Sequence, residues 1–412
     1  MSNRTNQLEA PLPKSSPSGS DETGLILSIN GGSSSIKFSA FAADDLANRL
    51  MSGSIERIGS PVSALVAKVS GSEPPTTIPI GATSISVATE RLVAYLQSCY
   101  SGRSITGIGH RIVHGGPELL EHQPITEALL THLRRAIPID LPHLPREIAL
   151  VEAFMAAFPS VRQVACFDTV FHRDMPHVAT LLPIPRRYHD QGIRRYGFHG
   201  LSYTYLMTQL AAIEPRAAAG RVILAHLGSG ASMVAVRDGK PIDTTMSFTP
   251  MSGLVMGTRP GDIDPGLLAY LVRVEKLDAS GLDAFVATQC GMLGISETSA
   301  DTRDLLDRCE TDARAADAIA LFCYQAKKFI GSLMAALGGL DTLVFSGGIG
   351  EHSPVIRACI CEGLTELGIT LDAARNAESA AVISPDGSRV VVRVIPTDEE
   401  RVIAETVGLH TR

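Results

Sequence analysis

The stretch Ile26-Leu-Ser-Ile-Asn-Gly-Gly-Ser-Ser-Ser35 decides the fold, because the chain contains a counterpart of it at Ile223-Leu-Ala-His-Leu-Gly-Ser-Gly-Ala-Ser232. Each stretch reads as an apolar strand, a run of very small residues and the start of a second strand, which is the pattern of a β-hairpin. Gly31 corresponds to Gly228, an offset of 228 − 31 = 197 residues. The spacing predicts two halves of similar design, each with one small-residue loop. The alternative is a chance likeness between two Gly/Ser hairpins.

Strand and helix patterns alternate outward from these hairpins. The longest helical pattern covers Ala313–Leu337 and ends at Gly338-Gly339, as expected for a helix that stops at glycine. Alternation of this kind predicts an α/β fold. The strand candidates are Leu25–Ile29, Ile36–Phe41, Gln163–Phe167, Val222–Ala225, Ser232–Val236, Thr342–Phe345 and Val390–Ile395.

Composition and charge exclude several classes of protein. The 412 residues are 45% hydrophobic and 19% charged, which predicts a globular chain of two or three domains. A net charge of −7 argues against nonspecific binding to the phosphate backbone of nucleic acid. No apolar run approaches the roughly 18 residues that a membrane span needs. The seven cysteines form no CxxC pair and are expected as free thiols in a reducing cytoplasm. Residues 1–23, rich in Ser, Pro and Asn, are expected to be a disordered extension.

Three segments of small residues have the composition of phosphate-binding loops. They are Asn30–Ser35 with Lys37 beyond it, Gly228–Ser232, and Ser346–His352. Tiny side chains let backbone N–H groups converge on an anion, and serine hydroxyls add donors. None of the three matches the P-loop or the dinucleotide fingerprint, and any one alone is equally typical of an ordinary tight turn. Together they predict a ligand that carries phosphate.

Two arginines stand in glycine-rich segments. Arg111 lies in Gly-His-Arg-Ile-Val-His-Gly-Gly, and Arg259 lies in Met-Gly-Thr-Arg-Pro-Gly. A planar guanidinium binds carboxylate or phosphoryl oxygens through paired hydrogen bonds. These arginines are therefore candidates for holding two anions. The alternative for Arg259 is an ordinary ion pair with Asp262 or Asp264.

Histidines are candidates for stabilising the charge of a transferring group. His143, His199 and His226 stand near glycine, proline or aromatic residues or at a strand end. No Cys/His spacing typical of a zinc site occurs in the sequence. A lone buried histidine is more often a structural hydrogen-bonding residue, so that alternative stays open for each.

Carboxylates suited to Mg²⁺ occur at two places. Asp168 ends a buried strand, where an ionised group is costly without a ligand or partner. Glu399 and Glu400 follow the last strand. The alternative for this pair is that they are first-turn acids favoured by the dipole of a helix.

Taken together, these segments resemble the acetate kinase family, part of the acetate and sugar kinase/Hsp70/actin superfamily. The resemblance covers the chain from Gly24 to its last residue. It rests on motifs in one order: Ile29-Asn-Gly-Gly-Ser-Ser-Ser-Ile-Lys37, Gly109-His-Arg-Ile-Val-His-Gly-Gly116, Phe167-Asp-Thr-Val-Phe-His172, Tyr196-Gly-Phe-His-Gly200, His226-Leu-Gly-Ser-Gly-Ala-Ser232, Met256-Gly-Thr-Arg259 and Gly347-Gly-Ile-Gly-Glu351.

The resemblance implies two duplicated actin-like (ribonuclease H-like) domains with the active site in the cleft between them. The first would comprise 24–168 plus 396–412, and the second, nucleotide-binding domain would comprise 169–395. The implied reaction is reversible transfer of the γ-phosphoryl group of ATP directly to acetate, giving acetyl phosphate and ADP. Mg²⁺, or Mn²⁺ in its place, would be required. The resemblance also implies a cytoplasmic homodimer with no nucleic-acid or membrane partner.

Residue roles follow from the resemblance position by position. Arg111 and Arg259 would clamp the carboxylate and the phosphoryl group, His199 would stabilise the transition state, and Asp168 would position the metal or the acceptor. Asn30 and Glu399 would serve the metal. The acyl pocket would be walled by Val113, Pro142, Phe198 and Pro250. The phosphates and nucleotide would contact Lys37, Ser33, Ser35, His143, His226, Gly228, Ser229, Gly230, Asp301, Thr302, Arg303, Gly348, Ile349, Gly350, Glu351 and His352.

Several positions depart from the family pattern and keep rival functions open. Ser229 and His352 stand where asparagine is usual, which bears on the phosphoryl donor, and pyrophosphate is a rival to ATP. Pro142 stands where leucine is common, which bears on acyl-chain length, so propionate or butyrate is a rival to acetate. A nucleotide-binding module without acyl transfer is the rival from another class. The presence of Arg111 in its motif argues against it, because ATP binding alone would not require this residue.

Overall fold

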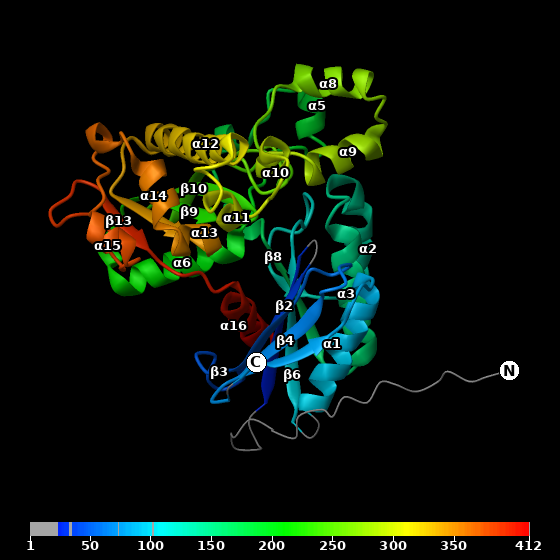
Figure 1. Cartoon of the computed structure of the whole chain (residues 1–412). Helices are drawn as coiled ribbons and strands as arrows, with labels where there is room; N and C mark the ends of the chain where they lie inside the picture. The colour runs from blue at the N-terminus through cyan, green and yellow to red at the C-terminus, as the bar shows by residue number, and fades with distance from the viewer. Residues whose placement is uncertain (1–23, 33–34, 73, 101–102, 412) are drawn as a thin grey trace.

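The computed structural model describes residues 24–32, 35–72, 74–100 and 103–411. The expected extension 1–23 and the candidate residue Ser33 lie outside the described residues. Two β-sheets, each with helices on both faces, form two bodies that meet along one side (Figure 1). The predicted α/β fold is confirmed.

The first sheet has eight strands in the order β5-β4-β3-β2-β1-β6-β8-β7. Its strands are β1 (Leu25–Gly31), β2 (Ile36–Ala42), β3 (Arg49–Glu56), β4 (Ala64–Val69), β5 (Thr76–Pro79), β6 (Ile105–Ile112), β7 (Gln123–Pro124) and β8 (Arg162–Phe167). The second sheet has five strands in the order β11-β10-β9-β12-β13. These are β9 (Arg221–Leu227), β10 (Ala231–Arg237), β11 (Lys240–Thr244), β12 (Thr342–Ser346) and β13 (Val391–Val394).

The two sheets share one topology. In the first, β1 pairs antiparallel with β2 and parallel with β6; in the second, β9 pairs antiparallel with β10 and parallel with β12. The order β3-β2-β1-β6-β8 thus corresponds strand for strand to β11-β10-β9-β12-β13. The duplication predicted from the two hairpins is confirmed, and the chance-likeness alternative is excluded.

Helices cover both faces of the first sheet. One face packs against α1 (Ile85–Cys99) and α3 (Leu144–Ala157), and α2 (Glu127–Ala136) lies beside α3. The other face packs against α16 (Glu399–Thr411), the last helix of the chain. Alternate residues of β1 serve the two cores: Leu25, Leu27 and Ile29 face α1 and α3, whereas Ile26 faces α16.

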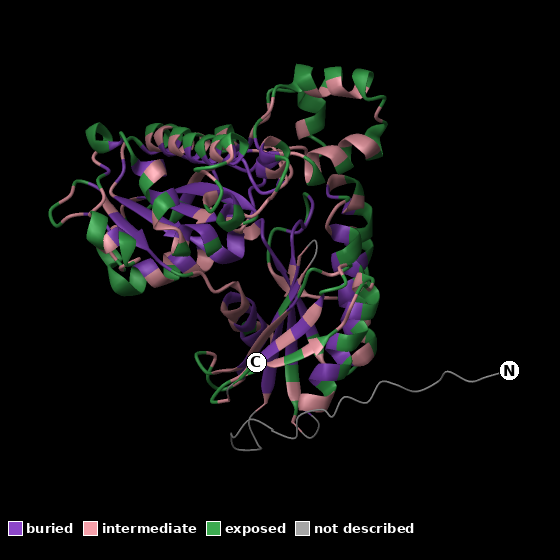
Figure 2. Cartoon of the chain, in the orientation of Figure 1, coloured by how far each residue is buried: buried purple, intermediate pink, exposed green. Residues whose placement is uncertain are grey.

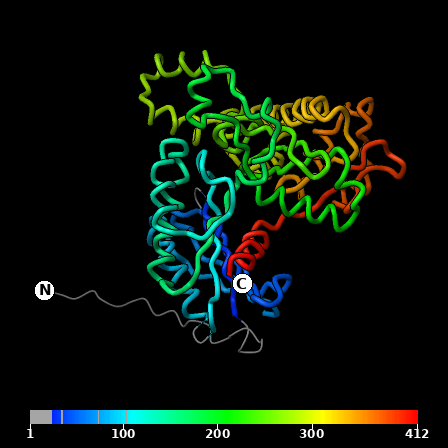
Figure 3. The backbone as a smooth tube through the Cα atoms, turned by 180° about the vertical axis from the view of Figure 1, so that it is seen from behind, coloured from blue at the N-terminus to red at the C-terminus, as the bar shows by residue number. Residues whose placement is uncertain are grey.

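Helix α16 lies unusually close to the first sheet. A Cβ atom at Gly107 would lie 2.4 Å from Val407 Cγ1, and one at Gly109 would lie 2.3 Å from Ile403 Cγ2. Strand β6 therefore needs glycine where the helix rests on it. Figure 3 shows α16 leaving the second body and lying along the first sheet.

The second sheet is also covered on both faces. Helix α12 (Ala313–Leu337) packs on one face and α6 (Gly200–Ile213) on the other. The bounds predicted for α12 are confirmed, because Gly338 ends it with a φ of 71°. The other helices are α4 (His177–Thr180), α5 (Arg186–His189), α7 (Pro215–Ala218), α8 (Pro265–Val274), α9 (Ala279–Thr288), α10 (Gly291–Ser296), α11 (Thr302–Leu306), α13 (Gly347–His352), α14 (Pro354–Cys361) and α15 (Ala373–Ala377), with 3₁₀ turns at Ile137–Ile139, Val170–His172 and Thr365–Leu367.

The chain passes between the bodies in two places, after β8 and after β13. At the first passage Gly200 N donates to the Asp168 carbonyl at 2.9 Å, and a Cβ atom at Gly200 would lie only 2.1 Å from that oxygen. Glycine is therefore required there. The domain ranges 24–168 plus 396–412 and 169–395 stay a prediction.

Helices α8 and α9 project from the second body and contain no buried residue (Figure 2). Leu267, Tyr270 and Val274 are exposed along α8 although they are apolar. Among the residues that the structure describes, no helix has the length and apolar composition needed to cross a membrane.

Candidate active site

A cavity of about 630 Å³ lies where the two bodies meet, and residues of both bodies line it. It brings together sixteen of the predicted site residues, which come from segments far apart in the sequence. They are Asn30, Ser35, Lys37, Arg111, Val113, His143, Phe198, His199, His226, Gly228, Ser229, Gly230, Pro250, Arg259, Gly348 and Glu399. The cavity is also lined by Gly32 and Gly347, which belong to two of the candidate phosphate loops, and by Glu400, the neighbour of Glu399 in the predicted carboxylate pair. Glu56 and Thr397 line it too, and the sequence did not single them out.

The remaining predicted residues lie elsewhere. Pro142 lines a much smaller neighbouring cavity, and Asp168 lies fully buried behind Arg111. The segment predicted to approach the nucleotide lies outside the cavity: Asp301 caps α11 by accepting from Arg303 N, and its carboxylate also pairs with the Arg303 guanidinium. Thr302, Ile349, Gly350, Glu351 and His352 do not line the cavity.

Arg111 is held from behind by a buried carboxylate. Its Nε and Nη2 donate to Asp168 Oδ2 at 2.9 and 2.5 Å, and its Nη1 donates to the Gly31 carbonyl at 3.4 Å. Burial by itself lowers the pKa of Arg111, but the carboxylates of Asp168 and Glu399 outweigh burial and leave the pKa above its usual value. The guanidinium is thus a fixed, permanent cation at the wall of the cavity.

Arg259 pairs with no carboxylate of the described residues. Its Nη1 donates to the Pro250 carbonyl at 2.7 Å. The alternative of an ordinary ion pair is excluded, since Asp262 accepts from Gly253 N and Asp264 caps α8. Burial, and then the nearby Arg111, lower the pKa of Arg259 to about 10, so it remains charged at neutral pH. Two buried cations that face one cavity favour an anionic ligand between them.

Two stacked imidazoles complete this side of the cavity. The rings of His199 and His226 lie 4.3 Å apart at an interplanar angle of 28°. Burial lowers the pKa of both rings. At His199 the neighbouring positive groups lower the pKa further, whereas at His226 the carboxylates of Glu399 and Glu351 oppose burial without outweighing it, so both rings are neutral at pH 7. His199 adopts a left-handed backbone conformation, with φ 59° and ψ 27°, at the start of α6. Strain of this kind in a residue other than glycine is typical of functional positions.

The loop between β9 and β10 lies directly beneath these donors. A Cβ atom at Gly230 would lie 2.6 Å from Arg259 Nη2 and 3.3 Å from His199 Nε2, and one at Gly228 would lie 3.9 Å from His226 Nε2. One guanidinium nitrogen and two imidazole nitrogens therefore converge over a loop without side chains at these two positions. This is the arrangement expected around a phosphoryl group.

The carboxylates of α16 approach the cavity from the first body. Asn30 Nδ2 donates to Glu399 Oε2 at 2.9 Å and to Glu400 Oε1 at 3.4 Å. Because α16 begins at Glu399, both acids are in its first turn, so the helix-dipole interpretation also holds. Burial raises the pKa of Glu399, but Arg111, His226 and Lys37 outweigh burial and leave the pKa below its usual value.

The side-chain oxygens at this end of the cavity fit an Mg²⁺ ion that a phosphate substrate helps to coordinate. Among the described residues, no group of three or more His, Cys, Asp or Glu side chains is arranged to hold a metal ion on its own. The chain offers the carboxylate of Glu399 and the side-chain oxygen of Asn30, which are hard donors of the kind that Mg²⁺ prefers. Mg²⁺ commonly takes one or two protein carboxylates and completes its shell with water and substrate phosphate. The donor set fits a metal carried by a phosphate substrate.

The prediction of a loop at Ser346–His352 is wrong, because residues Gly347–His352 form the short helix α13. Glu351 Oε1 accepts from Gly347 N at 2.8 Å and from Thr397 N at 3.1 Å, which stabilises the first turn. Only the N-terminal glycines of α13 reach the cavity.

Glu147 was not predicted, although it supports the site. Its Oε2 accepts from Val113 N at 3.0 Å, and its Oε1 has no hydrogen-bond partner among the described residues. Burial raises the pKa of Glu147 to about 8, although Arg111 opposes the shift. The sequence holds one signal: Glu147 interrupts the apolar spacing of Leu144, Ile148 and Val151 on the buried face of α3.

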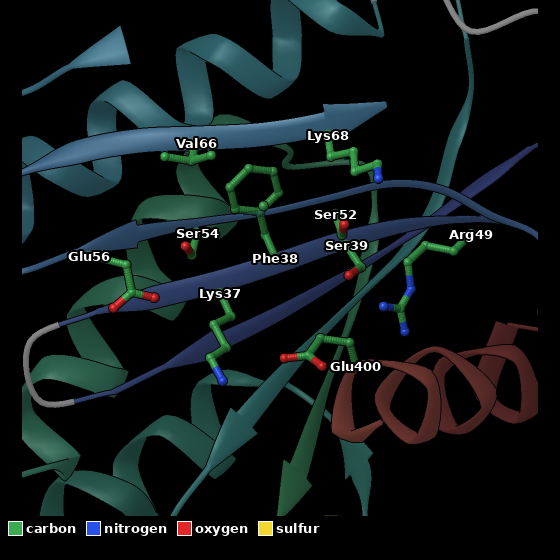
Figure 4. A pocket seen from close by; sticks show the side chains of 11 residues that line it. Lys37, Phe38, Ser39, Arg49, Ser52, Ser54, Glu56, Val66, Lys68 and Glu400 are labelled. Atoms are coloured by element: carbon green, nitrogen blue, oxygen red, sulfur yellow. The ribbon is translucent and has the colours of Figure 1, made fainter. Parts of the chain in front are cut away.

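A second cavity of about 330 Å³ opens beside the first, on the face of β2, β3 and β4 next to α16. Figure 4 shows Lys37 and Glu400 extending into it from opposite sides. Lys37, Glu56 and Glu400 line both cavities. Arg49 at its rim is neutralised by an ion pair with Asp398.

The sequence also resembles known proteins over nearly its full length. The Acetokinase family model matches residues 25–405. The chain is 40% identical to an acetate kinase of Methylocella silvestris, a match that covers 92% of this chain and 96% of that one. Among solved structures, it resembles a propionate kinase of Francisella tularensis (TM-score 0.86, 36% identity, covering 93% of this chain and 98% of that one) and the acetate kinase of Porphyromonas gingivalis (TM-score 0.81, 34% identity, with the same coverage).

The match therefore spans both sheets and every motif that lines the larger cavity. Two actin-like halves, a duplicated hairpin and two facing arginines are what the sequence led us to expect of such a fold. The chain belongs to the acetate kinase family and is a phosphotransferase of the acetate kinase type, with a carboxyl group as acceptor.

Proposed function

We propose that the protein transfers the γ-phosphoryl group of ATP to acetate, reversibly, and forms acetyl phosphate and ADP. The observation that carries this proposal is the pair Arg111 and Arg259, which project from different bodies into one cavity between two small-residue loops. A carboxylate and a phosphate repel each other, and two guanidinium groups offset that repulsion.

The proposed mechanism is direct in-line transfer. Acetate is already ionised at neutral pH, so the enzyme needs no strong general base. The remaining tasks are to align the two anions and to stabilise the negative charge that spreads over the transferring group. Arg259 and the imidazole of His199, both over Gly230, are placed to donate to that group, while Arg111 holds the acceptor carboxylate. Asp168 acts through Arg111, whose orientation it fixes.

We propose that Asn30 and Glu399 hold Mg²⁺ together with the phosphate oxygens of the nucleotide, and Mn²⁺ offers similar coordination. When bound, the metal neutralises part of the phosphate charge. Glu399 is ready for this role because its lowered pKa keeps it ionised at neutral pH.

The proposed acyl pocket is formed by Val113, Phe198 and Pro250, all of which line the cavity. Pro142 lies outside it, so this departure from the family pattern does not narrow the pocket directly. One methylene in an apolar pocket is worth only about 1–3 kcal/mol. Propionate is therefore the second candidate acceptor, which the resemblance to a propionate kinase also favours.

ATP is the proposed donor. Gly348 at the start of α13 and Lys37 on β2 line the cavity and are placed for the phosphates. Asp301 and Arg303 are proposed to meet the base and ribose, which requires the two bodies to move closer or the nucleotide to extend beyond the cavity. Pyrophosphate needs neither contact and stays the rival donor.

A hydroxamate assay tests this assignment. Acetate, propionate and butyrate are each supplied with ATP or pyrophosphate and Mg²⁺, and the acyl phosphate is trapped by hydroxylamine. We expect the highest kcat/KM with acetate and ATP. Acyl hydroxamate from none of the acceptors would contradict acyl transfer, whereas a preference for propionate or for pyrophosphate would replace the acceptor or the donor alone.

We further propose a cytoplasmic homodimer that contacts through α8 and α9. Half-exposed apolar side chains along α8, namely Leu267, Tyr270 and Val274, favour a second copy as the partner. All seven cysteines belong to the described residues and are free, as expected in a reducing compartment.

A further inference from the structure

Two buried hydroxyl groups lie in line behind the imidazole of His199. Tyr203 on α6 and Ser232 on β10 form a short hydrogen bond, and Ser232 Oγ lies 2.8 Å from His199 Nδ1. Both Tyr203 and Ser232 are completely buried. The chemistry assigned to the cavity uses neither of them.

The direction of these hydrogen bonds follows from the position of Tyr203. Its ring is enclosed by Phe171 and His172, and its hydroxyl has no acceptor other than Ser232 among the described residues. A buried hydroxyl must donate its proton, so Tyr203 donates to Ser232. Ser232 then donates its own proton to His199 Nδ1, its only other partner in the part of the chain that the structure describes.

An imidazole that accepts at Nδ1 carries its proton on Nε2 when it is neutral. His199 is neutral, since burial and the neighbouring His226, Arg111 and Arg259 lower its pKa well below the usual value. Its Nε2 is the nitrogen that lies next to Gly230 and Arg259 Nη2. The hydrogen therefore points toward the group that Arg259 also faces.

We propose that Tyr203 and Ser232 are positioning residues that hold His199 as the Nε2–H tautomer, so that a neutral histidine donates a hydrogen bond to the transferring phosphoryl group. The proposal deepens the proposed function and rests on it for the identity of that group. Neutrality matters here, because a cationic imidazole beside the guanidinium of Arg259 would be repelled by it. A neutral donor adds stabilisation without adding charge.

The neighbouring His226 also has a serine hydroxyl beside its Nδ1, but the chain of hydroxyls behind it leads to the cavity. Ser202 Oγ lies 2.8 Å from His226 Nδ1 and 2.8 Å from Thr397 Oγ1. Ser202 and Tyr203 are adjacent on α6, so one turn of this helix serves both imidazoles. Thr397 itself lines the cavity.

The test uses the full-length enzyme and three test and control variants, with His199→Gln as a fourth variant for assigning the spectra. Ser232→Ala removes the donor at Nδ1, and Ser232→Ala with Tyr203→Phe removes both hydroxyls without leaving a buried tyrosine proton unpaired. Thr208→Ala is the matched control, since it removes an exposed hydroxyl from the same helix. Circular dichroism and thermal melts establish that each variant folds.

The first readout is the tautomer itself. Two-bond ¹H–¹⁵N correlation spectra of ¹⁵N-histidine-labelled protein distinguish Nε2–H from Nδ1–H, and the His199 signals are assigned by their loss in His199→Gln. We expect Nε2–H in the wild type and in Thr208→Ala, and a mixture or Nδ1–H in both Ser232 variants. This readout needs no catalytic activity, so it separates failure of the proposal from failure of the proposed function.

The second readout is the split between kcat and KM. We expect both Ser232 variants to lower kcat by about ten-fold or more, as loss of one transition-state donor does, while KM for both substrates changes much less. Thr208→Ala should match the wild type. His199 in the Nδ1–H form in the wild type, or an unchanged kcat in both folded Ser232 variants, would overturn the proposal.

Discussion

At the scale of single residues, the two arginines of the cavity are held in different ways. Arg111 donates two hydrogen bonds to the carboxylate of Asp168, whereas Arg259 donates one to a backbone carbonyl. Removing one partner of a buried ion pair leaves an uncompensated charge, which costs far more than losing the pair's net attraction. The two positions should therefore separate catalysis from stability.

We expect Arg111→Ala and Arg259→Ala each to lower kcat by roughly 10²–10⁵-fold, because the first removes the charge that holds the acceptor carboxylate and the second removes the charge that stabilises the transferring group. Arg111→Ala should also lower the free energy of unfolding by about 3–5 kcal/mol, since Asp168 stays behind unpaired. Arg259→Ala should lower it little. Urea denaturation and steady-state kinetics measure both effects.

A near-normal kcat in either variant would refute the assigned role. The double variant Arg111→Ala with Asp168→Ala is the control for the buried charge. It should recover stability relative to Arg111→Ala and remain as inactive.

Glu147 predicts a pH dependence of stability. Its pKa is raised to about 8 in the folded protein, so between the ordinary carboxyl pKa and pH 8 the folded state binds more protons than the unfolded state. The free energy of unfolding therefore falls as pH rises through this window, by up to about 5 kcal/mol. Glu147→Gln keeps the acceptor for Val113 N and should lack this fall, as urea denaturation from pH 5 to 9 will measure.

Glu152→Gln, an exposed position on the same helix, is the control and should keep the wild-type pH profile. Parallel profiles for wild type and Glu147→Gln would contradict the buried, protonated state of Glu147. The sequence did not identify this residue as part of the site, because a glutamate in an amphipathic helix is ordinarily solvated. Only the path of β6 places the Val113 amide beside it.

At the scale of elements, the β9–β10 loop leaves room for the donors above it because Gly228 and Gly230 have no side chains. We expect Gly230→Ala to lower kcat by about ten-fold or more, because the added methyl displaces Arg259 Nη2 and His199 Nε2. Thermal stability should change little, since both side chains can move. Kinetics with a thermal melt will check this.

Gly331→Ala is the matched control for that experiment. Gly331 lies within α12, and a Cβ atom there meets nothing within 4 Å. It should keep full activity and gain up to about 1 kcal/mol of stability, as glycine-to-alanine changes in helices do. Wild-type kcat in Gly230→Ala would show that the donors do not converge over this loop.

The elements that could be predicted carry their signals locally. Helix α12 has a capping aspartate, Asp312, and a terminal glycine, and its bounds were predicted to the residue. Helix α13 was not predicted, because its sequence is rich in glycine and the bonds that fix it come partly from Thr397, 46 residues away. Strands β3 to β5 were also not predicted, because their polar, partly exposed residues follow the pattern weakly.

At the scale of the whole molecule, two ten-residue stretches of similar pattern predicted the duplicated topology, since a hairpin fixes the pairing of its two strands and leaves few orders for the other strands. The projecting pair α8 and α9 follows from no such rule. The apolar composition of these two helices predicts that they are buried, but neither helix contains a buried residue in the single chain.

We expect Leu267→Glu on α8 to convert a dimer into a monomer, because a charge would be buried in the proposed contact. Sedimentation velocity across a range of concentrations measures this. Leu409→Glu, at an exposed apolar position on α16, is the control and should leave the assembly unchanged. A wild-type protein that sediments as a monomer at all concentrations would contradict the dimer.

The placement of α16 has a consequence for biosynthesis. This helix follows every other described element, yet Val402, Ile403 and Val407 close one face of the sheet that is translated first. During synthesis on the ribosome, Ile26 and Phe41 therefore stay uncovered by α16 until the second sheet has been translated. The nascent amino-terminal sheet is thus the part of this protein that we expect a chaperone of exposed apolar surfaces to bind.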